Sequence, residues 1–149
     1  MNRIDATFEQ LHSRDQAAFI PFFTAGDPDL DTTEELLVRA GERGADLLEV
    51  GFPMSDPVAD GPTIQASYTR VLERGQRTDE VFEVVRRARE RTETPMVAMI
   101  SYTLVFKMGH EEFVERALEA GFDGATIPDL PIEEAEGLHE LCREKDFRL

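Results

Sequence analysis

A glutamate stands inside an apolar segment of this chain, and an aspartate follows it in a loop rich in proline and glycine. Glu49 lies in the apolar run of residues 47–51, and Asp60 directly precedes Gly61 and Pro62. Removing an ionised carboxylate from water is costly, so burial raises its pKa. A carboxyl group whose pKa lies near neutrality can both give and take a proton. We therefore expect Glu49 to be an acid–base group and Asp60 to be its partner.

Each carboxylate also has a plainer explanation, which the residues alone leave open. Glu49 would fit a structural carboxylate paired with an arginine or a buried water. Asp60 alone would be an ordinary turn residue. It becomes a candidate for chemistry because its loop follows the strand that contains Glu49. Asp27 and Asp129 also precede prolines, where the start of a helix would favour a negative charge.

Alternation of side chains decides where Glu49 points. In an extended strand, Leu48 and Val50 face one side of the sheet, whereas Leu47, Glu49 and Gly51 face the other. If the first pair packs on helices, Glu49 points to the interior of a sheet or barrel.

A strand–loop–helix unit repeats four times along the chain. We expect strands at residues 17–23, 46–51, 95–100 and 123–127, the first of them buried on both faces. Helices should follow the strands, with an amphipathic helix at residues 2–13 before them and Asp31 as the N-cap of the next one. Such units predict an α/β fold with a parallel sheet and helices outside. Residues 146–149 resemble the entrance to a fifth strand.

Polar residues gather after the strands rather than before them. In parallel α/β folds, ligands bind at the carboxyl ends of the strands. Four separate loops therefore indicate one functional face: residues 24–28, residues 54–62, residues 101–103 and Asp129.

The charge and the cysteine content exclude several classes of protein. The formal net charge is −15, with 31 acidic and 16 basic residues, which argues against nucleic acid or an anionic membrane as partner. The single cysteine and three widely spaced histidines give neither an internal disulfide nor the spacing of a metal site. The N-terminus is polar, and no apolar run reaches membrane-spanning length. We expect a soluble, cytoplasmic protein.

Three segments resemble one known family. Residues 49–65, EVGFPMSDPVADGPTIQ, closely resemble the signature of the tryptophan synthase alpha subunit. Residues 22–28 resemble that family's first strand and loop, and residues 123–131 are similar to its fourth. The resemblance covers essentially the whole chain. It implies a TIM (β/α)₈ barrel, of which residues 1–149 form a single incomplete domain with about four units and an N-terminal helix.

The resemblance also implies an activity and roles for several residues. The family cleaves indole-3-glycerol phosphate into indole and glyceraldehyde 3-phosphate by a retro-aldol step, a lyase reaction of tryptophan biosynthesis. Glu49 matches the acid–base residue, and Asp60 matches the carboxylate that binds the indole N–H. Phe22 and Ile127 match apolar walls of the indole pocket. Asp129, on the same functional face, is a further candidate for substrate binding.

A partner is implied as well. The family assembles with a beta subunit into an alpha2-beta2 complex, and Pro53 and Asp56 match the loop that touches that subunit. No cofactor or metal is expected on this chain, and pyridoxal phosphate is expected only on the beta subunit.

One segment departs from the family pattern. Ser101 stands where many members have a pocket tyrosine, and Thr103 where they have asparagine. Tyr102 reaches the pocket only if the end of this strand is shifted by one residue. Both Ser101 and Tyr102 therefore remain candidates for this wall.

The length leaves two alternatives. A complete barrel needs about 250 residues, so the family's phosphate-binding strands are expected beyond Leu149. The chain is then the amino-terminal half of such an enzyme, or else a natural half-barrel that serves as a binding or assembly module through its exposed edges. An open reading frame that continues past Leu149 favours the first, and a stop codon there favours the second.

We expect residues 1–149 by themselves to be nearly inactive, because they lack the phosphate anchor and half of the barrel wall. A steady-state assay of indole release checks this expectation. Turnover close to that of an intact family member would contradict it.

Overall fold

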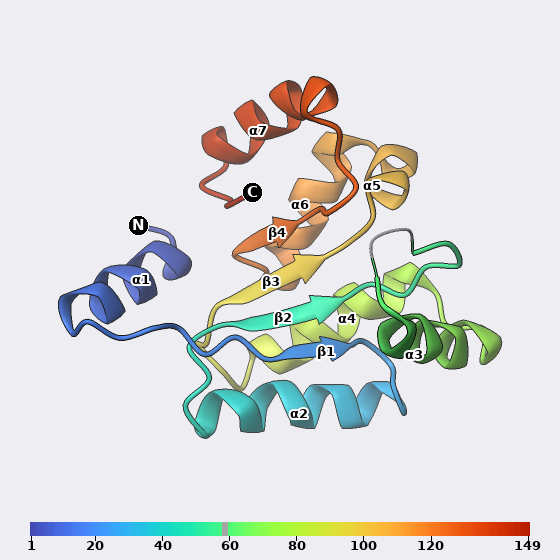
Figure 1. The fold of residues 1–149 in the computed structure, drawn as a ribbon, viewed down its shortest axis with the longest axis horizontal. Helices are drawn as coiled ribbons and strands as arrows, with labels where there is room; N and C mark the ends of the chain where they lie inside the picture. Colours follow the sequence, from blue (N-terminus) through green and yellow to red (C-terminus); the bar gives the residue numbers. More distant parts are fainter. Residues whose placement is uncertain (58–59) are drawn as a thin grey trace.

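The computed structural model describes residues 1–57 and 60–149. At its centre, four parallel strands pair in the order β1-β2-β3-β4. The arrows point the same way in Figure 1, so their carboxyl ends share one edge of the sheet. The predicted parallel α/β sheet is confirmed. The strands are β1 (Phe22–Thr24), β2 (Leu48–Gly51), β3 (Met96–Met99) and β4 (Gly124–Thr126).

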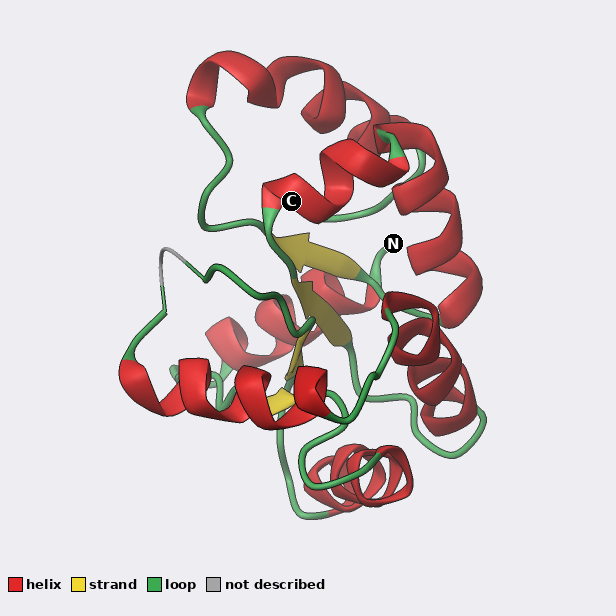
Figure 2. Cartoon of the chain, turned by 90° about the vertical axis from the view of Figure 1, so that its right-hand side faces the viewer, coloured by secondary structure: helices red, strands yellow, loops and turns green. Residues whose placement is uncertain are grey.

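Helices connect the strands and wrap around one side of the sheet, as the view onto the strand ends shows (Figure 2). The first helix, α1, lies instead near the amino ends of the strands (Figure 1). In chain order the helical elements are α1 (Arg3–Ser13), α2 (Leu30–Glu42), α3 (Pro62–Glu73), α4 (Thr78–Arg89), α5 (Tyr102–Met108), α6 (His110–Ala120), the 3-10 turn η1 (Ile132–Glu134) and α7 (Ala135–Glu144).

The two faces of the sheet differ in burial, as the alternation along β2 predicts. Leu48 and Val50 are fully buried against the helix layer, where Ala98 of β3 lies in register with Val50. On the inner face, Glu49 is paired in register with Phe22 and Val97, and all three are half-buried. Apolar packing on the outer face therefore fixes Glu49 on the inner face.

The first strand is shorter and more exposed than expected. Only Phe22–Thr24 form a strand, whereas Phe19 and Ile20 are 61% and 42% exposed. The prediction of a strand buried on both faces over residues 17–23 is wrong. β1 is the outer strand of the described sheet, and the N–H of Phe19 binds the side chain of Asp46 instead of a neighbouring backbone.

The start of α2 also differs from the prediction. Asp29, not Asp31, is the N-cap, because its side chain accepts a hydrogen bond from the N–H of Thr32. Asp31 lies in the first turn and pairs with Arg87 of α4. More than one residue near the start of α2 is of a type that can serve as N-cap, and sequence spacing alone does not identify which one does.

The last residues begin to pair beside β4. Gly124 and Arg148 form a parallel bridge, and the N–H of Ala125 donates to the carbonyl of Arg148 at 2.7 Å. This contact agrees with the expected entrance to a fifth strand.

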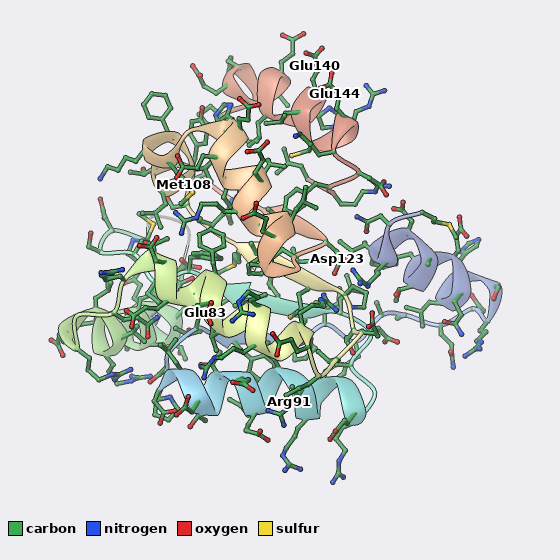
Figure 3. All side chains as sticks on the ribbon, turned by 180° about the vertical axis from the view of Figure 1, so that it is seen from behind. Glu83, Arg91, Met108, Asp123, Glu140 and Glu144 are labelled. Atoms are coloured by element: carbon green, nitrogen blue, oxygen red, sulfur yellow. The ribbon has the colours of Figure 1, made fainter. Side chains whose placement is uncertain are left out.

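Acidic side chains lie mainly on the outer faces of helices. Figure 3 shows Glu83 on α4, and Glu140 and Glu144 on α7, on the outside of the helix layer. Glu83 pairs with Arg86 at 2.7 Å, and exposed pairs of this kind contribute little to stability.

Along the described ranges, no helix is long and apolar enough to cross a membrane. The same residues hold no cluster that could bind a metal ion.

Two aspartates repeat one arrangement at the amino ends of the strands. Asp46 donates its N–H to the carbonyl of Phe19 and accepts the N–H of Phe19 at 2.8 Å. Asp123 does the same with Met96, donating to its carbonyl and accepting its N–H at 2.9 Å. Asp46 thus ties its helix-to-strand corner to the segment before β1, and Asp123 ties its corner to the first residue of β3.

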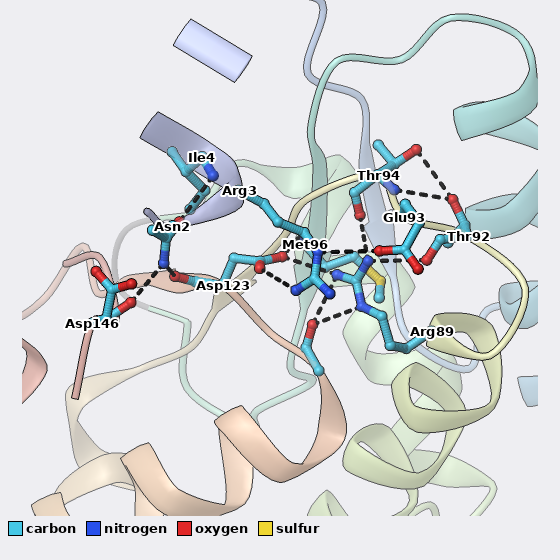
Figure 4. Close-up of polar contacts among 11 residues, drawn as sticks. Asn2, Arg3, Ile4, Arg89, Thr92, Glu93, Thr94, Met96, Asp123 and Asp146 are labelled. Carbon is cyan, nitrogen blue, oxygen red and sulfur yellow. Dashed lines mark hydrogen bonds and ion pairs between the residues drawn. The ribbon is translucent and has the colours of Figure 1, made fainter. Parts of the chain in front are cut away.

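Asp123 carries a larger network than Asp46. Its buried carboxylate also pairs with Arg89 at 2.9 Å and with Arg3 of α1 at 3.0 Å (Figure 4). The side chain of Asn2 donates to the Asp123 carbonyl at 2.9 Å. The network therefore joins α1, α4, β3 and β4 at the end of the sheet opposite the functional face.

The two corners allow a matched test of this network. Asp123→Asn removes the buried carboxylate that pairs with Arg89, whose side chain is 13% exposed, so we expect a loss of about 3 kcal/mol in the free energy of unfolding. Asp46→Asn can keep the hydrogen bond from Phe19, so its effect should stay within about 0.5 kcal/mol. Urea denaturation followed by circular dichroism measures both. Equal losses in the two variants would contradict the assigned difference.

Candidate active site

A pocket lies at the carboxyl ends of the strands, where the polar loops were expected to meet. Its walls come from the end of β3, from the segments after β2, β3 and β4, and from the middle of α3. The lining residues in the described ranges are Phe52, Met54, Pro57, Asp60, Tyr68, Met99, Ile100, Ser101, Pro128 and Asp129. The pocket therefore combines apolar walls with two carboxylates and two hydroxyls.

Glu49 lies on the inner face of β2, near the edge of the sheet that carries this pocket. It is half-buried, and no ion pair or side-chain hydrogen bond to its carboxylate is found within residues 1–57 and 60–149. Burial, and secondarily the charge of Asp60, raise the pKa of Glu49 above its ordinary value. Within the described residues Glu49 therefore lacks the arginine partner of a structural carboxylate, and its acid–base role stays a prediction.

Asp60 lines the pocket from the loop before α3. Burial raises the pKa of Asp60, and the charge of Asp129 raises it further. Gly61 is the N-cap of α3 and Pro62 its first residue, as the sequence predicted. Gln65 donates to the Asp60 carbonyl at 2.6 Å, which ties the loop to the helix.

Asp129 serves a neighbouring helix rather than the one that follows it. Its carboxylate accepts the hydroxyl of Ser101 at 2.6 Å and the N–H of Tyr102 at 2.7 Å. Tyr102 is the first residue of α5, so the charge lies at that helix's N-terminus, where it is favourable. The expected helix electrostatics thus apply to α5, and a role of Asp129 in substrate binding stays a prediction.

The structure separates the two candidates for the β3 wall. Ser101 lines the pocket and is buried. Tyr102 begins α5, and its hydroxyl lies 3.3 Å from Nε2 of His110, away from the pocket lining. Ser101 is thus a lining residue of this pocket and Tyr102 is not, and the contact of either with a substrate stays a prediction.

The two expected apolar walls lie in different places. The ring of Phe22 lies against Gly51 on the inner face, where a side chain at residue 51 would collide with it. Ile127 packs against the hydrophobic core and is not among the lining residues. Phe22 is therefore close to Glu49 in the register of the sheet, and the contact of Ile127 with a ligand stays a prediction.

Asp27 is engaged by α3, not by a helix of its own. Arg70 pairs with it at 2.5 Å, Ser67 donates to it, and these contacts hold the pKa of Asp27 below its ordinary value. Arg74 and Gln76 donate to the carbonyls of Gly26 and Ala25 in the same loop. The expectation of helix-terminus electrostatics is wrong for Asp27, whose carboxylate fixes the β1 loop on α3.

The expected partner contacts lie on the loop after β2. Pro53 is half-buried, and Asp56 is exposed. Their contact with another subunit stays a prediction. Val58 and Ala59 of the resemblance motif lie outside the described residues.

Tyr68 is a pocket residue that the sequence analysis did not identify. It shares the apolar stripe of α3 with Ile64 and Val71, and its position predicts packing against the sheet. In the structure it is 2% exposed, yet it lines the pocket. The sequence held one signal that could have identified it. A phenol stands within an apolar stripe, in the helix that follows the loop of a candidate acid.

Comparison with known proteins identifies the family. The family described as "Tryptophan synthase alpha chain" matches residues 8–149. A curated tryptophan synthase alpha chain from Caldanaerobacter subterraneus is 49% identical over 149 residues, which are 100% of this chain and 57% of the relative. A tryptophan synthase alpha chain from Rhodopirellula baltica is 45% identical over 152 residues, and this chain covers 55% of its length. The chain belongs to the tryptophan synthase alpha chain family.

Solved structures support the same assignment for the fold. The alpha subunit from Legionella pneumophila str. Paris aligns with a TM-score of 0.93 at 38% identity, over 99% of this chain and 56% of that chain. A chain of the tryptophan synthase a2b2 complex from Pyrococcus furiosus aligns with a TM-score of 0.82 at 38% identity. The alignment covers 87% of this chain and 53% of that chain. These neighbours are TIM barrels, so the four units have the architecture of that fold. The chain spans 55–57% of the length of the two curated relatives described above.

The raised pKa of Glu49 has a consequence for stability. As the pH rises past the ordinary value, the unfolded chain ionises first, while the folded chain keeps its proton up to the raised pKa. The folded state therefore loses stability over this interval. Glu49→Gln cannot ionise, so its stability relative to the parent should increase as the pH rises through the interval and then level off.

Denaturant midpoints measured between pH 4 and pH 8 check this expectation. Glu140→Gln, on the outer face of α7, is the matched control and should show no such trend. A constant difference between Glu49→Gln and the parent would contradict the assigned environment.

Proposed function

We propose that the complete protein carrying residues 1–149 cleaves indole-3-glycerol phosphate into indole and glyceraldehyde 3-phosphate, a lyase step of tryptophan biosynthesis. The observation that supports this most directly is the pair of carboxyl groups at the carboxyl ends of the strands. Glu49 and Asp60 lie beside apolar walls and have raised pKa values. The family to which the chain belongs agrees with this reaction.

The proposed step breaks the bond between C3 of the indole and the carbon of the side chain that bears the adjacent hydroxyl. Protonation at C3 turns the ring into an electron sink, and a base then takes the hydroxyl proton. The hydroxyl carbon becomes the aldehyde, and the electron pair of the broken bond returns to the ring. A carboxyl group with a raised pKa can give one proton and accept the other, which is the role proposed for Glu49.

Asp60 has a separate role in this proposal. Protonated indole carries positive charge, and its N–H becomes a stronger donor as that charge develops. A carboxylate held at the N–H stabilises the transition state more than the ground state. The half-buried position of Asp60 strengthens the interaction, because less water screens it.

The assembly is proposed on the same basis. A beta subunit would bind the face that carries Pro53 and Asp56, as the existence of the Pyrococcus furiosus a2b2 complex suggests. We propose that this chain's step needs no cofactor, that pyridoxal phosphate is bound by the beta subunit, and that the complex acts in the cytoplasm.

Substitution of the two carboxyl groups tests the proposed reaction. In the complete protein, Glu49→Gln should lower kcat/KM for indole release by about 10²–10⁴-fold, the range for loss of general acid–base catalysis. Asp60→Asn should lower it by about 10²–10³-fold, as for a lost electrostatic contact. Glu140→Gln should have no effect. Full cleavage activity in Glu49→Gln would refute the assignment.

A further inference from the structure

We propose that Asp129 is a positioning residue that acts through Asp60: its negative charge, fixed at the pocket by two hydrogen bonds, makes Asp60 a stronger hydrogen-bond acceptor for the indole N–H. The inference rests on the function proposed above and adds a third carboxyl group to its pair.

The geometry places the two aspartates in one pocket but on different elements. Asp60 lies in the loop before α3, and Asp129 lies in the segment after β4. Apolar side chains and prolines form most of the remaining described lining. Two charges interact more strongly where such walls exclude water. The charge of one aspartate therefore acts on the other across the pocket without a hydrogen bond between them.

Two donors hold the Asp129 carboxylate in place. Oδ2 accepts the hydroxyl of the buried Ser101 at 2.6 Å, and Oδ1 accepts the N–H of Tyr102 at 2.7 Å. Neither donor is basic, so the hydrogen bonds stabilise the charge without cancelling it. Since each oxygen already has a donor, Asp129 acts on the site through its charge rather than as a free acceptor.

The Asp60 carboxylate is held differently. In the part of the chain that the structure describes, it has no hydrogen bond or ion pair, and Gln65 binds only its backbone carbonyl. The carboxylate is thus open to the N–H of a ligand. Burial raises the pKa of Asp60, and the charge of Asp129 raises it further. A more basic carboxylate is the stronger hydrogen-bond acceptor.

The other elements around Asp60 supply no second fixed charge of this kind. Glu49 faces it from β2, and the charge of Asp60 raises the pKa of Glu49 in turn. Asp27, after β1, is already paired with an arginine of α3 at 2.5 Å. Tyr68 of α3 is a neutral phenol, and the lining residues of the β3 segment carry no charge. Within the described lining, Asp129 is the one charged side chain besides Asp60.

Asp129→Asn in the complete protein tests the inference, because it removes the charge and keeps the shape. The amide can still accept the N–H of Tyr102 and can donate to Ser101. The carboxyl titration of Asp60, followed by ¹³C NMR and assigned by its loss in Asp60→Asn, should move to lower pH. The acidic limb of the kcat/KM profile should move the same way. Its plateau should fall by about 10-fold, less than the loss of about 10²–10³-fold for a direct contact.

Two further variants distinguish the charge from a structural role. Asp129→Glu keeps the charge and should leave the Asp60 titration close to that of the parent. In the Asp60→Asn background, Asp129→Asn should lower kcat/KM by less than about twofold, because the group through which it acts is gone. Losses that multiply in the double variant would overturn the inference.

The titration also separates this inference from the proposed function. If the parent protein releases no indole but the Asp60 titration still moves in Asp129→Asn, the proposed reaction fails and the action of Asp129 on Asp60 stands. If the titration of Asp60 stays in place, the inference is overturned, whatever happens to turnover or thermal stability.

Discussion

Backbone pairing of β2 with both neighbours is the constraint on which the site depends. Its register places Glu49 between Phe22 and Val97, and places Val50 in the row that packs on the helices. A slip by one residue would turn every side chain of the strand to the opposite face. It would expose fully buried aliphatic groups and bury a carboxylate in the helix layer, both at considerable cost. The outer face of β2, which touches no ligand, therefore holds the acid in place.

The two ends of the sheet use the same residue type in different ways. At the amino ends, Asp46 and Asp123 accept backbone N–H groups, and Asp123 also pairs with two arginines. At the carboxyl ends, Asp27 and Asp129 are likewise satisfied by nearby donors. Glu49 and Asp60 have raised pKa values instead. Donors that surround an acid favour its charged form, and burial without such donors raises its pKa.

The sequence predicts most of the architecture, because the signals for it are local. The period of strands, loops and helices gives the parallel sheet, and alternation within residues 47–51 places Glu49 on the inner face. Long-range partners have no local signal. The donors to Asp129 come from the segment after β3, and those to Asp27 come from α3. Tyr68 was missed for a related reason, since a phenol in an apolar stripe predicts packing and only the close approach at Gly51 reveals its hydroxyl beside β2.

The backbone also distinguishes the two carboxyl groups of the site. Asp60 directly precedes Gly61, the N-cap of α3, so the unpaired N–H groups of that helix favour a negative charge there. Glu49 projects from the middle of a strand, where strand dipoles provide no such field. The charge of Asp60 raises the pKa of Glu49, so the two acids resist being ionised together, and a negative charge is more stable where the local field favours it. We propose on this ground that Asp60 holds the charge and Glu49 keeps a proton to give. This division is the one that the proposed cleavage requires, and it arises from the position of each acid relative to the start of α3.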